Sequence, residues 1–353
     1  MELRRIPVKR ISQFIYDTCI AAGINADHAR IIMEQMTESD LQEIHSHGII
    51  RLPMYIKRVK AGGYNLNPNI RLINETPVSA IVDGDNGFGQ VVVRTAVETA
   101  IAKAEKCGIA WVGTRNSNHA GAGGSYAIRA IPHDMIGIYM AVGNANHMPP
   151  WGGIDKMLST NPLTIAIPTK KEYPILLDMA TTNASFGKIK VYAQQGKPLP
   201  VGWMIDKHGN PLTDASKYEE GILVPIGDYK GYGLNFVIGA LAGVLNGAAF
   251  AKTTIDFNHD HKTPTNSGQA FMAMRVDLFQ DVEKFKETMD EKVREMKSVT
   301  PIDPKNPVLL PGEIGFRDRP MIQEKGIPVS DILLAQLREV AEMYNLEERF
   351  PEF

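Results

Sequence analysis

Residues 116–126 read NSNHAGAGGSY, and this glycine-rich stretch decides which kind of α/β fold the sequence predicts. It follows an apolar run, residues 109–114, that is typical of a buried strand, and it precedes a short helical segment. A crevice between a strand end and a helix start commonly binds ligands in α/β proteins. The Rossmann fingerprint G-x-G-x-x-G requires glycine or alanine at its last position, where this chain has Tyr126. The sequence therefore predicts an α/β protein that would hold any dinucleotide in another way.

The segments on both sides of this stretch show strand-like and helix-like patterns. Short apolar or alternating runs predict strands at residues 70–74, 79–83, 136–142, 161–168, 174–179 and 267–276. Apolar residues at helical spacing predict helices at residues 8–22, 26–43, 54–60, 91–106, 183–193, 231–246, 282–299 and 329–344. We expect an α/β (α+β) fold in which residues 1–68 and 282–353 form one helical domain. Residues 69–281 would form the α/β cofactor- and substrate-binding domain, with a mixed sheet.

Composition excludes several classes of function. The 38 basic and 40 acidic residues are well mixed and give a net charge of −2, so we expect no nucleic-acid partner. The two cysteines, Cys19 and Cys107, provide no disulfide framework, which is typical of a reducing compartment. The longest apolar run, residues 234–245, contains Asn235 and glycines and is too short to cross a bilayer. We expect a soluble, cytoplasmic protein without a membrane partner.

Residues 46–55, SHGIIRLPMY, concentrate hydrogen-bonding side chains at a predicted corner between helices. His47 titrates near neutral pH and can move a proton, while Arg51 can bind a carboxylate through two parallel hydrogen bonds. Tyr55 lies four residues after Arg51 and shares its helix face. This combination suits an enzyme of 2-hydroxy or 2-oxo acids. The same pattern is also typical of a capped surface helix with solvated histidines.

Two further polar segments adjoin predicted strands. Residues 177–182, LDMATT, place Asp178 at a strand end, where a buried carboxylate can hold a histidine in one tautomer. Residues 159–162, STNP, form a polar turn that leads into a strand. Ordinary turn capping explains both patterns equally well.

Two other segments suggest anion or metal binding. Residues 229–233, YKGYG, place Lys230 and Gly231 at the start of a helix, which favours a phosphate contact. They lack the GK[ST] order of a P-loop, and an ordinary first turn is the alternative. Residues 258–261, NHDH, hold two histidines around an aspartate but lack a third ligand at tetrahedral spacing. We therefore expect no metal site.

Seven motifs occur in one order along nearly the whole chain, and together they are specific. They are SHGIxRLPxY (46–55), NSNHxG (116–121), PWGG (150–153), TNPL (160–163), DMATT (178–182), KGYGL (230–234) and LPGE (310–313). This set resembles the malate/L-lactate dehydrogenase family of NAD(P)-dependent oxidoreductases, which is distinct from the Rossmann-type dehydrogenases. The resemblance implies a non-Rossmann cofactor fold and a homodimer whose active sites lie near the subunit interface.

The resemblance also implies roles for individual residues. His47 would be the proton donor and acceptor, with Asp178 as its partner, and Arg51 would bind the substrate carboxylate. In the ureidoglycolate dehydrogenase branch the base corresponds to His119 instead, and both alternatives stay open. The implied substrate contacts are Ser46, Arg51, Tyr55, Asn144 and Thr160. The implied contacts to NAD or NADP are Ser46, His119, Thr160, Asn161, Asp178, Met179, Ala180, Lys230, Gly231, Gly312, Glu313 and Ile314.

Three departures from the family pattern bear on the substrate. Gln42-Glu43 stands where many relatives have Arg-Gly, and Ser159 replaces a glycine. The loop at residues 142–148 is one residue longer than usual and is expected near the substrate. The exact substrate, the choice between NAD and NADP, and any assembly beyond a dimer therefore stay open.

Other functions compete with a malate- or lactate-type dehydrogenase. Ureidoglycolate oxidation and reduction of a cyclic ketimine would use the same hydride and proton delivery. A cofactor-binding protein without catalysis is disfavoured because both histidines and Asp178 are present. A metal-dependent hydrolase is disfavoured because its ligands are missing.

Overall fold

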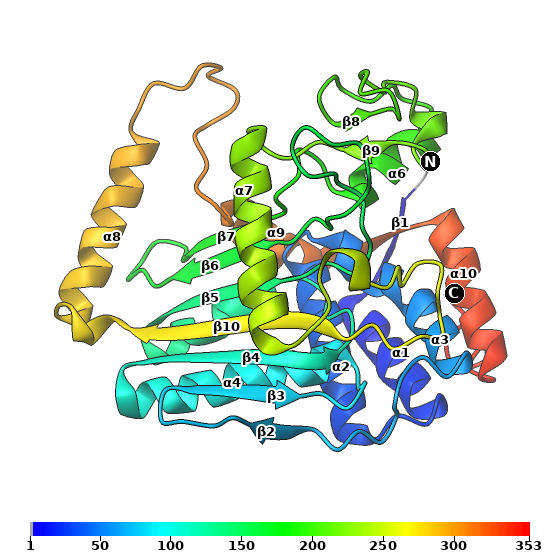
Figure 1. The fold of residues 1–353 in the computed structure, drawn as a ribbon, viewed down its shortest axis with the longest axis horizontal. Helices are drawn as coiled ribbons and strands as arrows, with labels where there is room; N and C mark the ends of the chain where they lie inside the picture. Colours follow the sequence, from blue (N-terminus) through cyan, green and yellow to red (C-terminus); the bar gives the residue numbers. More distant parts are fainter. Residues whose placement is uncertain (1–2) are drawn as a thin grey trace.

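The computed structural model describes residues 3–353 and is built around one seven-stranded mixed sheet (Figure 1). Across the sheet, the strands are β2 (Arg71–Ile73), β3 (Ser79–Asp83), β4 (Ile109–Ser117), β10 (Ser267–Arg275), β5 (Met135–Ala141), β6 (Leu163–Ile167) and β7 (Ile175–Met179). Only β3 and β4 pair in parallel, and α4 (Gly89–Cys107) provides the crossover that a parallel pair requires. The predicted α/β class with a mixed sheet is confirmed.

Both faces of the sheet are covered. On one face, α4 packs its buried valines and alanines, among them Val92, Ala96 and Ala100, against the strands. On the other face lies α7 (Tyr229–Ile238), which crosses the sheet in Figure 1. The predicted single helix over residues 231–246 is wrong in its second half, because a π-helical turn (Gly239–Gly243) and a 3-10 turn (Val244–Asn246) follow α7. This turn begins at Gly239, where a Cβ would lie 2.0 Å from the Phe250 ring, so only glycine allows this close packing.

The two chain ends pack together on the right of Figure 1. They contribute α1 (Val8–Ala21), α2 (Ala26–Leu41), α3 (Leu52–Lys60) and α10 (Asp331–Met343) to one apolar core. The sequence reading missed the short antiparallel pair of β1 (Leu3–Ile6) and β11 (Ile327–Ser330), which joins the first and last parts of the described chain. It also missed α9 (Glu313–Lys325), whose interior Pro320 weakens the helical pattern.

One helix of the C-terminal part lies apart from the N-terminal helices. α8 (Val282–Lys297) lies far from α1 and α10 in Figure 1, although residues 282–353 were expected to join the N-terminal helices. Its Asp290 accepts hydrogen bonds from the backbone N–H groups of Lys170 and Lys171, in the turn between β6 and β7. An amphipathic pattern shows that a helix has one buried face, but it does not identify the surface that covers it. The division into two domains itself stays a prediction.

A smaller apolar cluster lies beside the main sheet. It contains α6 (Phe186–Gln194) and the two-stranded pair β8 (Met204–Ile205) and β9 (Ile222–Leu223). The glycine-rich segment after β4 forms only α5 (Gly124–Ala127) and a 3-10 turn (Ile128–His133). Within residues 3–353, no helix is long and apolar enough to span a membrane.

Candidate active site

The Ser-His-Gly motif lies on a corner between α2 and α3 that is built from two single 3-10 turns, His45–His47 and Ile49–Arg51. The buried Asp40 holds both turns, because its carboxylate accepts from His45 Nδ1 at 2.9 Å and from the Ile49 N–H at 2.8 Å. Only glycine fits at position 48, where a Cβ would lie 2.1 Å from the Asp40 carboxyl. Asp40 therefore fixes the backbone that carries His47.

Arg51 presents a free guanidinium beside His47. Its Nε donates to the Ser46 carbonyl at 2.7 Å, while Ser46 Oγ and His47 Nδ1 form a hydrogen bond of 2.8 Å. Among residues 3–353, Arg51 has no salt bridge, so its two terminal nitrogens are free to bind an anion.

His119 reaches the same place from the distant glycine-rich loop. Its Nδ1 lies 2.8 Å from the Tyr55 hydroxyl, and its ring stacks with that of His47 at a centroid distance of 5.5 Å. The Phe257 ring also stacks with His119, at 5.1 Å. Within residues 3–353, the Nε2 atoms of both histidines have no hydrogen-bond partner. The two histidines and Arg51 thus form a single site.

The surroundings keep both histidines uncharged at neutral pH. Burial and the Arg51 guanidinium lower the pKa of His47 to about 3. Burial, followed by Arg51 and His47, lowers the pKa of His119 well below its usual value. Burial raises the pKa of Tyr55, so its hydroxyl keeps its proton. Both rings can therefore accept a proton, and a bound carboxylate that neutralises Arg51 would raise their pKa values.

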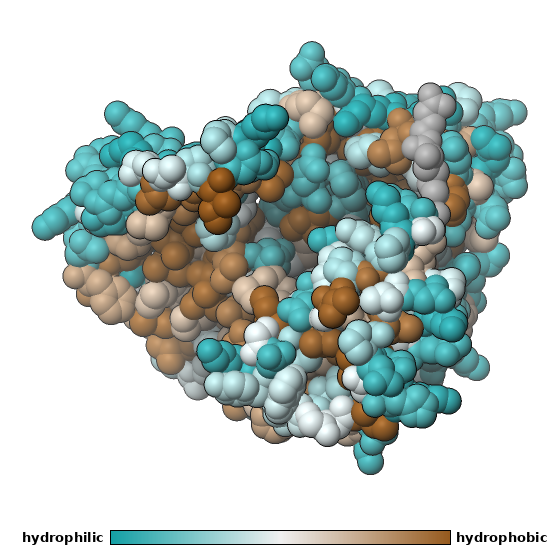
Figure 2. Space-filling view, turned by 90° about the horizontal axis from the view of Figure 1, so that it is seen from above, coloured by the Kyte–Doolittle hydropathy of each residue, from teal (hydrophilic) through white to brown (hydrophobic). Residues whose placement is uncertain are grey.

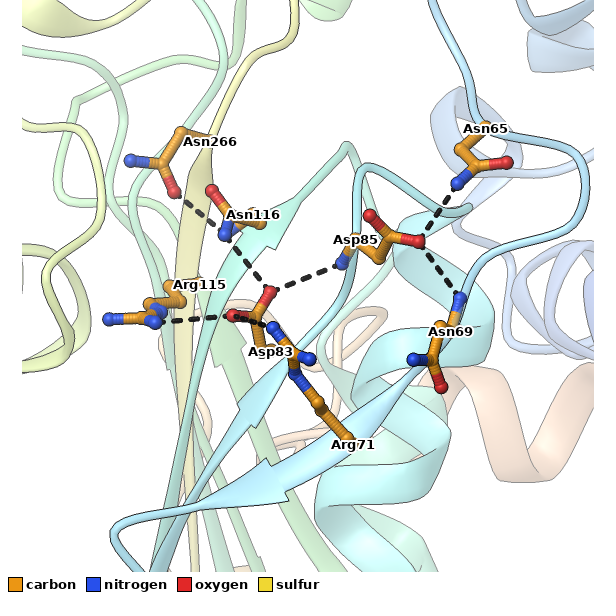
Figure 3. A network of polar contacts seen from close by, with 8 residues as sticks. All are labelled: Asn65, Asn69, Arg71, Asp83, Asp85, Arg115, Asn116 and Asn266. Atoms are coloured by element: carbon orange, nitrogen blue, oxygen red, sulfur yellow. Dashed lines mark hydrogen bonds and ion pairs between the residues drawn. The ribbon is translucent and has the colours of Figure 1, made fainter.

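The start of the His119 loop is held by a polar network at the ends of β3 and β4 (Figure 3). Asp83 accepts from the Asn116 side chain at 2.9 Å and from Arg115 at 3.1 Å. The Asn116 N–H donates to Asn266 at 2.7 Å, which joins the loop to the start of β10. Burial acts to raise the pKa of Asp83, but the bonds from Asn116 and Arg115 outweigh it, so the pKa is lowered. The network therefore holds a charged carboxylate beneath this loop.

The expected partnership of Asp178 with His47 stays a prediction. Within residues 3–353, no hydrogen bond joins them, since the Asp178 carboxylate accepts from Thr164 Oγ1 at 2.8 Å and from the Gly124 N–H at 2.9 Å. Burial raises the pKa of Asp178. Its contacts place it beneath the glycine-rich loop after His119. A carboxylate at a strand end has several neighbours in the fold, and sequence spacing cannot distinguish among them.

Several of the predicted cofactor contacts lie on β7 or next to one of its two ends. The Leu176 N–H donates to the Pro311 carbonyl at 3.0 Å, which brings residues 312–314 next to the strand that carries Asp178 and Met179. Beyond the other end of β7, the Ile226 N–H donates to the Thr181 carbonyl at 3.0 Å, which brings the segment before α7 to the C-terminal end of the strand. Gly312, Glu313 and Ile314 therefore lie near the start of β7, whereas Ala180 and the beginning of α7, with Lys230 and Gly231, follow its other end.

Thr160 and Asn161 belong to a buried polar network. The Thr160 carbonyl accepts from the Thr181 N–H at 2.9 Å, and Asn161 donates to the side chain of Asn235 on α7 at 2.9 Å. Asn235 in turn donates to the Ser159 carbonyl at 2.7 Å. These hydrogen bonds therefore fix the turn of residues 159–162 relative to the segment after β7 and relative to α7.

Asn144 supports His119 indirectly. Its side chain donates to Ser267, and its carbonyl accepts from the N–H of Phe257, whose ring stacks with His119. Sequence reasoning missed Phe257, which adjoins the NHDH segment, and it missed Asp40. Neither residue belongs to a recognisable chemical motif.

The NHDH segment does not form a metal site. His259 is exposed and pairs with Asp256 at 3.1 Å. In the part of the chain that the structure describes, no group of three histidine, cysteine, aspartate or glutamate side chains is placed to hold a metal.

Comparison with known proteins adds independent findings. A model of the malate/L-lactate dehydrogenase family matches residues 6–338. The chain is 36% identical to malate dehydrogenase of Pyrococcus horikoshii, over 97% of this chain and 96% of that protein. It is 32% identical to ureidoglycolate dehydrogenase (NAD(+)) of Escherichia coli K12, over 97% of each. The solved structure of sulfolactate dehydrogenase from Methanocaldococcus jannaschii superposes with a TM-score of 0.89 at 35% identity, covering 97% of this chain and 98% of that one.

Proposed function

The chain belongs to the malate/L-lactate dehydrogenase family, and on that premise we propose that it transfers a hydride between NAD or NADP and a small 2-hydroxy or 2-oxo acid. It is an oxidoreductase that acts on the CH–OH group of hydroxy acids. The observation that carries the assignment is the meeting of His47, His119 and the unpaired Arg51 in one site.

Lys230 and the starts of α7 and α9, which lie near the two ends of β7, fit a phosphate-bearing cofactor. Lys230 is exposed and has no salt bridge within residues 3–353. α7 follows a segment bound at the C-terminal end of β7, and α9 begins beside the start of that strand; neither helix has a side-chain cap, which leaves backbone N–H groups for phosphate oxygens. At Gly312, which has a φ of +83°, a Cβ would lie 2.6 Å from Leu176, so glycine allows the chain to pass close to β7. When bound there, a nicotinamide cofactor supplies or accepts the hydride.

The protein's own residues bind the substrate and move the proton. Arg51 can orient the substrate carboxylate through its two free nitrogens. In oxidation, a neutral histidine accepts the proton of the 2-hydroxyl group, and in reduction the protonated histidine returns it. His47 and His119 both have a free Nε2 for this step, and the hydrogen bonds to Ser46 and Tyr55 fix the orientations of the two rings. Burial is the main cause of both lowered pKa values and the Arg51 charge adds to it, so neutralisation of that charge by substrate favours protonation.

The assignment is tested by following reduced-nicotinamide absorbance with NADH and NADPH in parallel. The panel is oxaloacetate, pyruvate, sulfopyruvate, diketogulonate, a cyclic ketimine and, in the oxidative direction, ureidoglycolate. We expect turnover with at least one 2-oxo or 2-hydroxy acid and a preference for one cofactor. Oxidation of NADH or NADPH with the ketimine alone would replace the proposal with imine reduction. A protein that binds neither cofactor by fluorescence would contradict the dehydrogenase assignment.

We also propose that the chain forms a homodimer through the outer side of α7 and the turn after it. Five apolar side chains there expose 50–61% of their surface: Tyr229, Phe236, Val237, Val244 and Leu245. Figure 2 shows hydrophobic residues gathered around a hollow on one face of the molecule. Clustered apolar surface of this kind is unusual on monomers and marks interaction sites. Because α7 starts next to the β7 end, such an interface would lie near the active site.

Sedimentation tests the homodimer. Phe236→Asp places a charge in the cluster and should shift the dimer to monomer, because the charge would be buried without a partner. Phe279→Asp, at an exposed phenylalanine beside α8, is the matched control and should remain dimeric. A wild-type monomer at micromolar concentration would contradict the proposal.

The expected cytoplasmic location rests on composition and cysteine state. Cys19 and Cys107 are both free thiols, and unpaired cysteines are typical of a reducing compartment. Cell fractionation with a tagged chain tests this placement, and recovery outside the cytoplasm would contradict it.

A further inference from the structure

We propose that Lys190 on α6, together with His147, forms a second anion site beside Arg51 and selects acids that carry a second negative group. The preferred substrates would be 2-oxo or 2-hydroxy acids bearing a further carboxylate or sulfonate. This inference rests on the proposed dehydrogenase function and concerns the same site. None of the sequence motifs contains Lys190 or His147.

The start of α6 packs against the catalytic corner. A Cβ placed on Gly187 would lie 3.5 Å from Ser46 Cβ, which is an ordinary van der Waals contact. Residues three apart on a helix share one face, so Lys190 lies on the same side of α6 as Gly187. The helix therefore presents Lys190 on the side of the corner that carries Ser46 and Arg51.

His147 is joined to Lys190 through Phe186. The rings of His147 and Phe186 stack at 4.2 Å with an interplanar angle of 5°, and the Lys190 ammonium lies 5.5 Å from the centre of the Phe186 ring. The backbone of His147 is fixed as well, because its N–H donates to Leu158 and its carbonyl accepts from Leu223. His147 lies in the loop of residues 142–148, so this unusually long loop contributes directly to the site.

The charges in this region are arranged for an anion. Within residues 3–353, neither Arg51 nor Lys190 forms a salt bridge. Burial and the nearby Arg51 lower the pKa of Lys190, while Glu219 and Asp256 act in the opposite direction. Two cations that repel each other gain most from a ligand that neutralises both.

His147 contributes a hydrogen bond without a charge. Burial is the main cause that lowers its pKa to about 4, and Lys156 and Lys190 add to the effect against Asp256. At neutral pH the subsite therefore offers one full positive charge on Lys190 and a neutral imidazole. With Arg51, the site offers two positive charges in total, which match a dianionic substrate better than a monoanionic one.

The test compares kcat/KM for oxaloacetate and sulfopyruvate with kcat/KM for pyruvate. In Lys190→Met, we expect the ratio of dianion to pyruvate to fall about 10- to 100-fold, the usual effect of losing one charged hydrogen bond. Lys190→Arg keeps the charge and should retain most of the ratio. Lys188→Met is the matched control, because this lysine of α6 lies over the Trp203 ring at 4.8 Å, and its ratio should not change. Separate kcat/KM values for oxaloacetate and sulfopyruvate show whether the site prefers a carboxylate or a sulfonate as the second negative group of the substrate.

Three outcomes would overturn the inference. The first is an unchanged ratio in Lys190→Met, and the second is an equal loss with all three acids. The third is a weaker NADH affinity, measured by fluorescence, with unchanged discrimination, which would assign Lys190 to the cofactor. In each case activity with some 2-oxo acid persists, so the proposed function stands. Absence of turnover with every acid in the wild type would instead refute the proposed function together with this inference.

Discussion

The two histidines of the proposed active site, His47 and His119, lie on segments that are stabilised in opposite ways. The corner that carries His47 is held from within its own neighbourhood, by Asp40 seven residues before it and Arg51 four residues after it. His119 is positioned by residues distant in sequence, since Tyr55 bonds its ring and Phe257 stacks on it. Both histidines belong to readable motifs, but the residues that support His119 are scattered along the chain, whereas those that support His47 lie close to it in sequence.

Replacing each histidine in turn should have the largest effect on turnover. The comparison would show which of the two segments carries the histidine that transfers the proton. His47→Gln and His119→Gln retain hydrogen-bonding capacity but cannot exchange a proton. For the histidine that acts as acid and base, we expect kcat to fall about 10²- to 10⁴-fold. The other variant should mainly raise KM, because its ring only lines the site.

Steady-state kinetics and NADH affinity should be measured for both variants. Unchanged NADH affinity would show that the cofactor region remains intact. If neither variant loses more than about tenfold in kcat, proton transfer by these histidines is contradicted.

Weakening the supports of the two segments should have a smaller effect. Asp40→Asn removes one of the two bonds that hold the His47 corner, and we expect kcat/KM to fall about tenfold with NADH affinity kept. Asp83→Asn weakens only one of several supports of the His119 loop, so a loss of about threefold or less is expected.

The pair Asp40→Asn and Asp83→Asn tests the comparison directly. Thermal unfolding of both variants separates a general loss of stability from an effect on the site. Equal losses of kcat/KM in the two variants, or a larger loss in Asp83→Asn, would contradict the comparison. They would show that the His47 corner does not depend on a single nearby residue more than the His119 loop does.

Glu43→Gly should give the smallest effect, on stability alone. Glu43 is exposed at the end of α2 with a φ of +62°, a left-handed conformation that glycine adopts without strain. We expect the free energy of unfolding to rise by about 0.5–1 kcal/mol, since relief of strain exceeds the added entropy of the unfolded chain.

Urea unfolding at neutral pH measures this change. Glu347→Gly, at another exposed glutamate near the C-terminus, is the control and should not stabilise the protein. A destabilised Glu43→Gly variant would show that the left-handed residue carries no strain.

The sequence by itself determined the fold class, most helices and strands, and the motifs that mark the site. These features depend on local periodicity, on glycines and on residue types at short spacing, all of which are written along the chain. His47, Arg51 and Tyr55 were recognisable for this reason, because they share one corner and the helix that follows it.

Only the tertiary structure decided which distant groups meet. It placed His119 against His47, gave Asp178 hydrogen bonds to Gly124 and Thr164, and put α8 at the far end of the sheet. It also brought Lys190 to the corner and revealed Asp40 and Phe257 as supports. The physical reason is that burial and hydrogen bonding depend on which surfaces pack together, and many pairings satisfy the same local pattern until the whole chain has folded.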